Sequence, residues 1–208
     1  MAAREQLLAA AERLIAERGI EVPIRDIAVA AGQRNHSAVN YHFGSRDGLI
    51  DAVIEQRMVA LEARRMQLLA EHEVAGDDDD VRALVAVLVR PQLELVGQPG
   101  ATHYARFLEA VRNHPVIMDR ARLDGAGRAA VRIVALRLDR ALAQFPPTQR
   151  RRRLEAMASA MFALLADFER EVQAGTVARA QRARVAEDII DMLAGLVSAA
   201  PMPSRVRR

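Results

Sequence analysis

Apolar residues recur at helical spacing along most of the chain. The first such stripe consists of Leu7, Leu8, Ala11, Leu14 and Ile15. Gly19 follows this stripe as a C-terminal stop signal. The two longest stripes lie at about 147–174 and 177–199, and no segment alternates apolar and polar residues as a half-buried strand does. The pattern therefore predicts an all-α protein with about nine or ten helices.

Turn and capping residues divide the remaining sequence into shorter helices. They are predicted at about 23–32, 36–42, 45–73, 81–96, 102–113, 115–123 and 126–145. Pro23 suits a first helical position, and Pro91 either kinks or divides the helix in which it lies. The acidic tract 76–80 is compatible with a metal or sensor site, but a solvated loop that caps the next helix is the favoured interpretation.

Composition supports helices and excludes several functional classes. The chain is 51% hydrophobic but only 3% aromatic, which disfavours sheets. Cysteine is absent, which excludes disulfides and thiol chemistry. No apolar run approaches the ~18 residues of a membrane span. The first helix carries charges that a signal peptide lacks, so we expect a cytoplasmic protein without a membrane partner.

The charge balance does not by itself indicate a nucleic-acid partner. All 30 basic residues are arginine, yet the formal net charge is only +3. Residues 1–46 contain six arginines and five acidic residues. Any prediction of nucleic-acid binding must therefore come from local sequence and not from bulk charge.

Residues 23–53 have the pattern of a helix-turn-helix. Ala28, Ala31 and Gly32 are small enough for two helices to pack closely. Asn35 suits the N-cap of the second helix. The outward face of that helix offers donors and acceptors for base edges and phosphates, from Asn35, His36, Ser37, Asn40 and Tyr41. Arg25 and Arg46 flank it as candidate phosphate ligands, so the pattern predicts binding in the major groove of DNA.

Residues 4–55 resemble the DNA-binding domain of the TetR family of bacterial transcriptional regulators. The resemblance lies in an amphipathic helix ending ERG, followed by RDIAVAAG and VNYHFGSRDGLIDAV. It implies a core anchor at Phe43 and DNA contacts by Arg25, Asn35, His36, Ser37, Asn40, Tyr41, His42 and Arg46.

Two positions differ from the family pattern. One extra residue separates Gly32 from Phe43, which lengthens the turn at Gln33-Arg34 and makes Arg34 a further candidate contact. Pro23 stands where members often carry a phosphate-binding threonine. Structural alternatives also exist: Tyr41 as a core aromatic, His36 as an exposed helix end, His42 as a bridge between helices and Arg46 as an ordinary surface residue.

The C-terminal two-thirds is expected to form a dimerisation and ligand-binding domain. The predicted domains are 1–46 for DNA binding, 47–200 for ligand binding and dimerisation, and a disordered basic tail at 201–208. The resemblance implies a homodimer through the last two helices, with the internal core as the alternative fate of their apolar stripes. The run 150–153 of four arginines is interpreted as a solvated face and not as a second DNA contact.

A small-molecule pocket is expected within this C-terminal bundle. Candidate walls are Tyr104, Phe107, Met118, Met161, Phe162 and Phe168, with His103 and Arg106 as polar groups. Ordinary core packing is the alternative for each. The scarcity of aromatic residues slightly favours an apolar or flexible effector, and no cofactor or metal is predicted.

Together these features predict a ligand-responsive dimeric regulator that binds a palindromic operator, most simply a repressor released by a small molecule. The alternative is a helix-turn-helix regulator controlled by a partner protein. An enzyme is disfavoured because the five histidines are scattered and no Glu-x-x-His helix pattern occurs.

Overall fold

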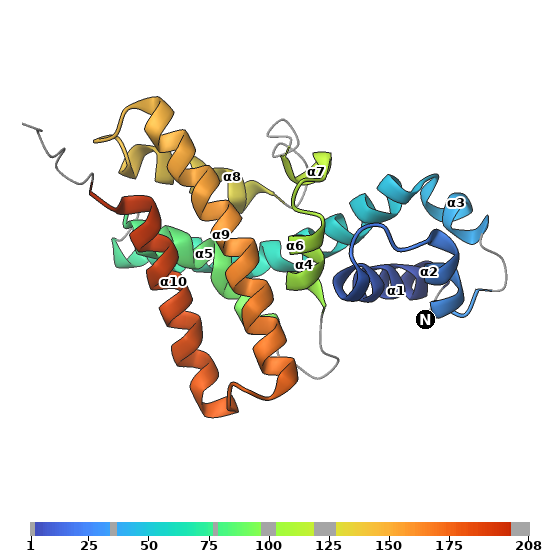
Figure 1. Ribbon diagram of the computed structural model, residues 1–208. Helices are drawn as coiled ribbons and strands as arrows, with labels where there is room; N and C mark the ends of the chain where they lie inside the picture. Colours follow the sequence, from blue (N-terminus) through green and yellow to red (C-terminus); the bar gives the residue numbers. More distant parts are fainter. Residues whose placement is uncertain (1–2, 34–36, 77–78, 97–102, 119–127, 201–208) are drawn as a thin grey trace, which may run out of the picture.

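The computed structural model describes residues 3–33, 37–76, 79–96, 103–118 and 128–200, and within these ranges every regular element is a helix (Figure 1). The helices are α1 (Ala3–Arg18), α2 (Ile24–Ala30), α3 (Ser37–Phe43), α4 (Arg46–Ala75), α5 (Val81–Leu95), α6 (Tyr104–Ala110), α7 (Pro115–Met118), α8 (Ala129–Ala141), α9 (Pro147–Ala174) and α10 (Arg182–Ser198). A 3-10 turn, Arg179–Gln181, precedes α10. The predicted all-α class is confirmed. None of the helices described has the length and apolarity to cross a membrane.

Side-chain capping sets the N-termini of two helices, α4 and α5. The Ser45 Oγ accepts a hydrogen bond from Gly48 N at 3.0 Å and caps α4. The Asp80 Oδ1 accepts one from Ala83 N at 2.7 Å and caps α5, as the interpretation of the acidic tract predicted. Pro91 lies inside α5, which continues as one helix to Leu95 and is not divided.

Three predicted helices differ from the observed ones at their ends. The helix α6 is shorter than 102–113, because hydrogen-bonded turns begin at Val111. The helix α8 ends at Ala141, and a turn then places Phe145, which is buried, into the core. The helix α10 begins at Arg182, after the 3-10 turn. The predicted tail and most of the helix at 115–123 lie outside the described residues.

An N-terminal core joins α1, α2 and α3 to the first half of α4. Its fully buried members include Leu7, Ile27, Val39, Leu49 and Ile50. Four residues from the α6 region, far away in sequence, belong to the same core: Tyr104, Phe107, Leu108 and Val111. Figure 1 shows α6 where the two halves of the molecule meet.

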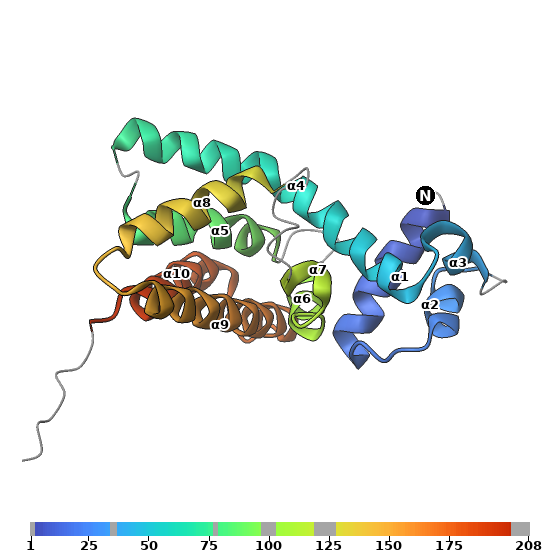
Figure 2. The same ribbon diagram turned by 90° about the horizontal axis from the view of Figure 1, so that it is seen from above.

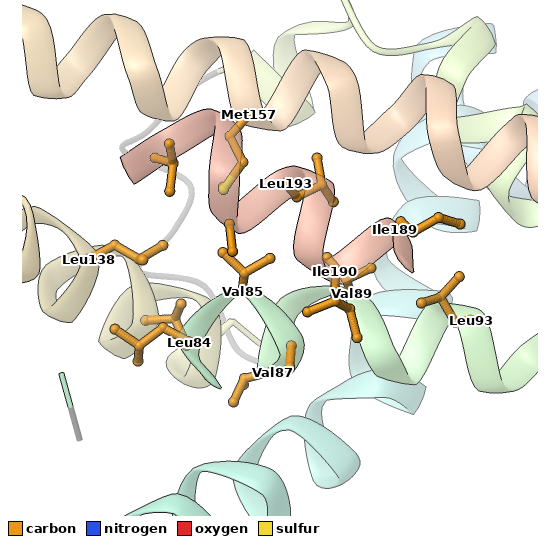
Figure 3. Close-up of a cluster of buried hydrophobic side chains, with 14 of the residues drawn as sticks. Leu84, Val85, Val87, Val89, Leu93, Leu138, Met157, Ile189, Ile190 and Leu193 are labelled. Atoms are coloured by element: carbon orange, nitrogen blue, oxygen red, sulfur yellow. The ribbon is translucent and has the colours of Figure 1, made fainter. Parts of the chain in front are cut away.

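The C-terminal core is built around α5, which packs against α4, α8, α9 and α10. Figure 3 shows Val85, Val89 and Leu93 of α5 close to Ile190 and other apolar residues of α10. Seen from above, α9 and α10 lie side by side on the opposite side of the bundle from α4 (Figure 2).

One uninterrupted helix, α4, contributes to both cores. Its residues Leu49, Ile50, Val53 and Ile54 pack in the N-terminal core, whereas Leu68 and Leu69 pack in the C-terminal core. The two cores therefore share one continuous helix.

Candidate nucleic-acid interface and internal cavity

The packing of α2 against α3 follows from small residues and a glycine turn. Ala28 is fully buried and Ala31 is nearly so, which allows the two helices to approach each other. Gly32 ends α2 with a φ of +71°, a conformation that glycine adopts without strain. Val39 of α3 is fully buried and anchors the helix from within.

A second glycine fixes the junction between α3 and α4. Gly48 sits so close to the end of α3 that a side chain there would collide with the carbonyl oxygen of Phe43. The Phe43 ring packs against the N-terminal core and lies 5.5 Å from the Arg4 guanidinium carbon. These contacts hold α3 in a defined orientation.

The outward face of α3 is polar and accessible. Ser37, Asn40 and Tyr41 are exposed, with 86% of Tyr41 accessible to solvent. Tyr41 is therefore not a core aromatic. His42 is half-buried, and its ring lies edge-on to that of Tyr41 at 4.9 Å. Arg25 is exposed on α2. Figure 1 places α3 at the end of the molecule remote from α9 and α10.

Arg46, a predicted phosphate ligand, makes hydrogen bonds within the domain. Its Nη1 donates to the Ile20 carbonyl at 2.5 Å and its Nη2 to the Val22 carbonyl at 2.6 Å. The side chain is half-buried and fastens the start of α4 to the loop between α1 and α2. The Arg46 guanidinium therefore has a structural role in the domain, and its contact with phosphate stays a prediction.

Three predicted DNA contacts, Arg34, Asn35 and His36, lie outside the described residues. The role of Asn35 as N-cap falls there as well. They stay predictions.

A largely apolar cavity of about 210 Å³ lies where α4, α5, α6 and α9 meet the segments around α7 and α8. Three of the predicted pocket residues, Tyr104, Met161 and Phe162, line it. The complete lining comprises Ile54, Met58, Arg65, Leu88, Gln92, Tyr104, Leu108, Ile117, Arg128, Val131, Met157, Ala158, Met161 and Phe162.

Two other predicted walls belong to the cores and not to the cavity. Phe107 is fully buried in the N-terminal core, where its ring stacks with Tyr104 at 6.3 Å. Phe168 is buried in the C-terminal core. Both residues are directed inward, as helical periodicity indicated, but neither lines the cavity. The side chain of Met118 lies outside the described part of the molecule.

The two predicted polar groups also lie elsewhere. His103 is beside α1, with its Nε2 3.7 Å from Glu17 Oε1, and burial together with nearby Arg106 lowers its pKa. The Arg106 Nη2 donates to Gln173 Oε1 at 2.7 Å. Neither residue lines the cavity, because both side chains are turned toward neighbouring helices.

Three buried polar residues of the cavity were missed by sequence reasoning. Arg65 is 3% exposed, Gln92 5% and Arg128 6%. The signal for Arg65 was its place in the apolar stripe of α4, four residues after Leu61 and three before Leu68. A charged residue at such a position is rarely buried unless it is paired or functional.

Two buried carboxylates connect α6 with neighbouring helices. Glu12 of α1 accepts hydrogen bonds from Arg57 Nε at 2.8 Å, Arg57 Nη2 at 2.9 Å and His103 N at 3.1 Å. Glu169 of α9 accepts one from Arg106 N at 3.0 Å, and burial raises the pKa of Glu169 to about 7. The start of α6 is thus tied to α1, α4 and α9 at once.

A helix-turn-helix domain with an exposed polar helix, joined through one continuous helix to a separate helical bundle, defines a DNA-binding transcriptional regulator. Residues 7–53 match the family of bacterial regulatory proteins, tetR family, and residues 86–195 match a tetracyclin repressor-like C-terminal domain. The second match alone covers more than half of the chain. The chain belongs to the TetR family, which is not a family of enzymes.

Individual relatives are distant. The chain is 30% identical over 122 residues to the HTH-type transcriptional dual regulator CecR of Shigella flexneri. That alignment covers 54% of this chain and 52% of the relative, so it spans about half the length of the curated protein.

Two solved structures share the fold at 20–21% identity. One is NalD, the secondary repressor of the MexAB-OprM multidrug efflux pump in Pseudomonas aeruginosa, with a TM-score of 0.51 over 92% of this chain and 94% of that one. The other is a Rhodococcus sp. protein described as a TetR-family regulator, with a TM-score of 0.50 over 92% and 98%.

Proposed function

We propose that the protein is a dimeric repressor that occupies a palindromic operator and leaves it when a small molecule enters the cavity. The observation that carries this proposal is the position of the cavity. Ile54, Tyr104 and Leu108 line it and are also members of the N-terminal core. A bound molecule therefore touches the same side chains that position the helix-turn-helix.

Release requires that the ligand bind one arrangement of the domains better than the other. A molecule seated between α4, α6 and α9 would change how α6 packs on them, and the bonds through Glu12 connect α6 to α1. Ligand binding and the orientation of α3 would thereby be linked.

Filling the cavity provides the test. Ala158 of α9 lines the cavity, and Ala158→Phe would place a ring in its space while leaving α3 unchanged. We expect this variant to bind operator DNA within about twofold of wild type, because Ala158 is not a member of the N-terminal core that positions α3. It should no longer respond to compounds that stabilise the wild-type protein and release it from DNA. Fluorescence anisotropy with fragments selected from genomic DNA measures both properties.

The matched control is Ala70→Phe, an exposed position on α4 outside the cavity. It should retain both DNA binding and release. If Ala158→Phe were still released as readily as wild type, the cavity would not be the effector site. If no compound acted but a partner protein displaced the wild type from DNA, the alternative of control by a protein would be favoured.

The dimer surface is proposed to lie on the outer layer formed by α9 and α10. Most of the predicted α10 stripe, including Ile189, Leu193 and Val197, faces the internal core, in agreement with the alternative stated above. Two large apolar residues remain outside: Met192 is 52% exposed and Leu196 is 43% exposed. They are four residues apart and so lie on one face of α10.

Charges on this face should prevent dimerisation. We expect the double variant Met192→Glu/Leu196→Glu to sediment as a monomer at micromolar concentration, because carboxylates buried without partners destabilise an interface strongly. Operator affinity should fall at least about 100-fold, since a monomer contacts one half-site only. Leu136→Glu, at an exposed leucine of α8, is the control and should remain dimeric. A dimer of the double variant with normal affinity would place the interface elsewhere.

A further inference from the structure

The most unusual group in the C-terminal half is the buried guanidinium of Arg65. It is 3% exposed, and its Nε has no hydrogen-bond partner. Its Nη1 donates to the sulfur of Met58 at 3.7 Å, and a thioether is a weak acceptor. Among the described residues no carboxylate lies within salt-bridge distance of Arg65, and burial lowers its pKa.

Glu62 carries the carboxylate whose charge acts on Arg65, and only one of its two oxygens has a hydrogen-bond partner among the described residues. Its Oε1 accepts a hydrogen bond from Ala130 N at 2.7 Å at the start of α8. The charge of Glu62 attracts Arg65 from one turn away along α4 without forming a salt bridge. The charge of Arg65 is therefore only partly compensated, and a buried charge in that state is costly.

Other polar atoms without partners are contributed to the same cavity by neighbouring helices. The Tyr104 hydroxyl on α6 and the Gln92 Oε1 on α5 are both buried and unbonded. Arg128 adds a second buried cation, with its Nη2 3.8 Å from Glu55 Oε2. The described lining thus combines an apolar wall with two guanidinium groups and no carboxylate.

We infer that the cavity binds a small carboxylic acid with an apolar body, its carboxylate paired with Arg65 and accepting from the Tyr104 hydroxyl. Arginine and a hydroxyl are the donors that a carboxylate needs. The volume of about 210 Å³ exceeds that of a cavity of about 150 Å³ that holds benzene, so an aromatic ring or a short alkyl chain with a carboxylate fits. This inference rests on the proposed function in that it names the chemical class of the effector.

The test uses 3-phenylpropionate and octanoate as probes, with 3-phenylpropionamide and octanol as neutral counterparts of similar size. Isothermal titration calorimetry at pH 7.5 on the full-length protein should show that the acids bind at least tenfold more tightly than the neutral compounds. In Arg65→Met the affinity for acids should fall about 10- to 100-fold, as expected for loss of a charge-assisted hydrogen bond. The affinity for the neutral compounds should remain or rise.

Tyr104→Phe provides a second, independent test if the Arg65→Met variant does not fold. It removes only the hydroxyl and should weaken acid binding several-fold without changing octanol binding. Equal binding of acids and neutral compounds to wild type, no binding of either, or undiminished acid binding by both variants would overturn the inference.

The same titrations separate this inference from the proposed function. If acids bind through Arg65 but leave the operator complex intact, the ligand class stands and the repressor release mechanism fails. If neutral compounds bind better than acids and release the DNA, the release mechanism stands and the inferred ligand class fails.

Discussion

Tyr41→Ala should weaken operator binding by about 2–4 kcal/mol, since both copies of α3 in a dimer each lose a contact worth about 1–2 kcal/mol. Tyr41 is the most exposed aromatic residue of the described chain and lies on the outer face of the helix that would enter the major groove. Because its side chain makes few contacts within the protein, its removal should not affect folding. Anisotropy titrations with operator DNA at moderate salt measure the loss.

Val74→Ala is a suitable control for this experiment. Val74 is 91% exposed but lies at the far end of α4, next to the C-terminal core. Both variants should unfold at the wild-type temperature, and only Tyr41→Ala should lose affinity. Wild-type affinity for Tyr41→Ala would mean that this face of α3 does not contact DNA.

Glu12→Ala should lower the free energy of unfolding by about 2–4 kcal/mol. Glu12 is only 6% exposed and receives three hydrogen bonds from Arg57 and His103. Removing one partner of a buried ion pair leaves the other charge poorly solvated, although Arg57 is partly exposed, which reduces the loss below that of a fully buried pair. Urea denaturation measures the change.

A double-mutant cycle with Arg57→Leu would isolate the pairwise interaction from other effects of each substitution. Glu17→Ala, on the same helix but 37% exposed, should change stability by less than about 1 kcal/mol. If Glu12→Ala were as stable as wild type, the connection between α1, α4 and α6 would contribute little to the fold.

The long helices were predictable because their apolar periodicity extends over many turns. The boundaries of α1, α4 and α9 follow the sequence pattern closely. The ends of α6 and α8 did not follow the sequence pattern, because the turns there depend on tertiary contacts such as the insertion of Phe145 into the core. Local propensity carries no information about such contacts.

The position of a site residue was predictable where it depended on the exposed face of one helix. It was not predictable where it depended on partners distant in the sequence. The polar outer face of α3 followed directly from its sequence. The structural hydrogen bonds of Arg46 could not be predicted because its partners are carbonyl groups more than twenty residues away. Periodicity also marked Phe107 and Phe168 as inward-facing, but it cannot distinguish residues beside a void from residues in a filled core. Arg65 was missed for the related reason that an arginine on a helix is usually at the surface.

The placement of the two tyrosines has a spectroscopic consequence. The chain contains two tyrosines and no tryptophan. One, Tyr104, borders the internal cavity, and the other, Tyr41, stands on the outer face of α3. Tyrosine fluorescence from this protein therefore originates at these two places alone. In Tyr104→Phe the remaining tyrosine signal reports on α3, and in Tyr41→Phe it reports on the cavity.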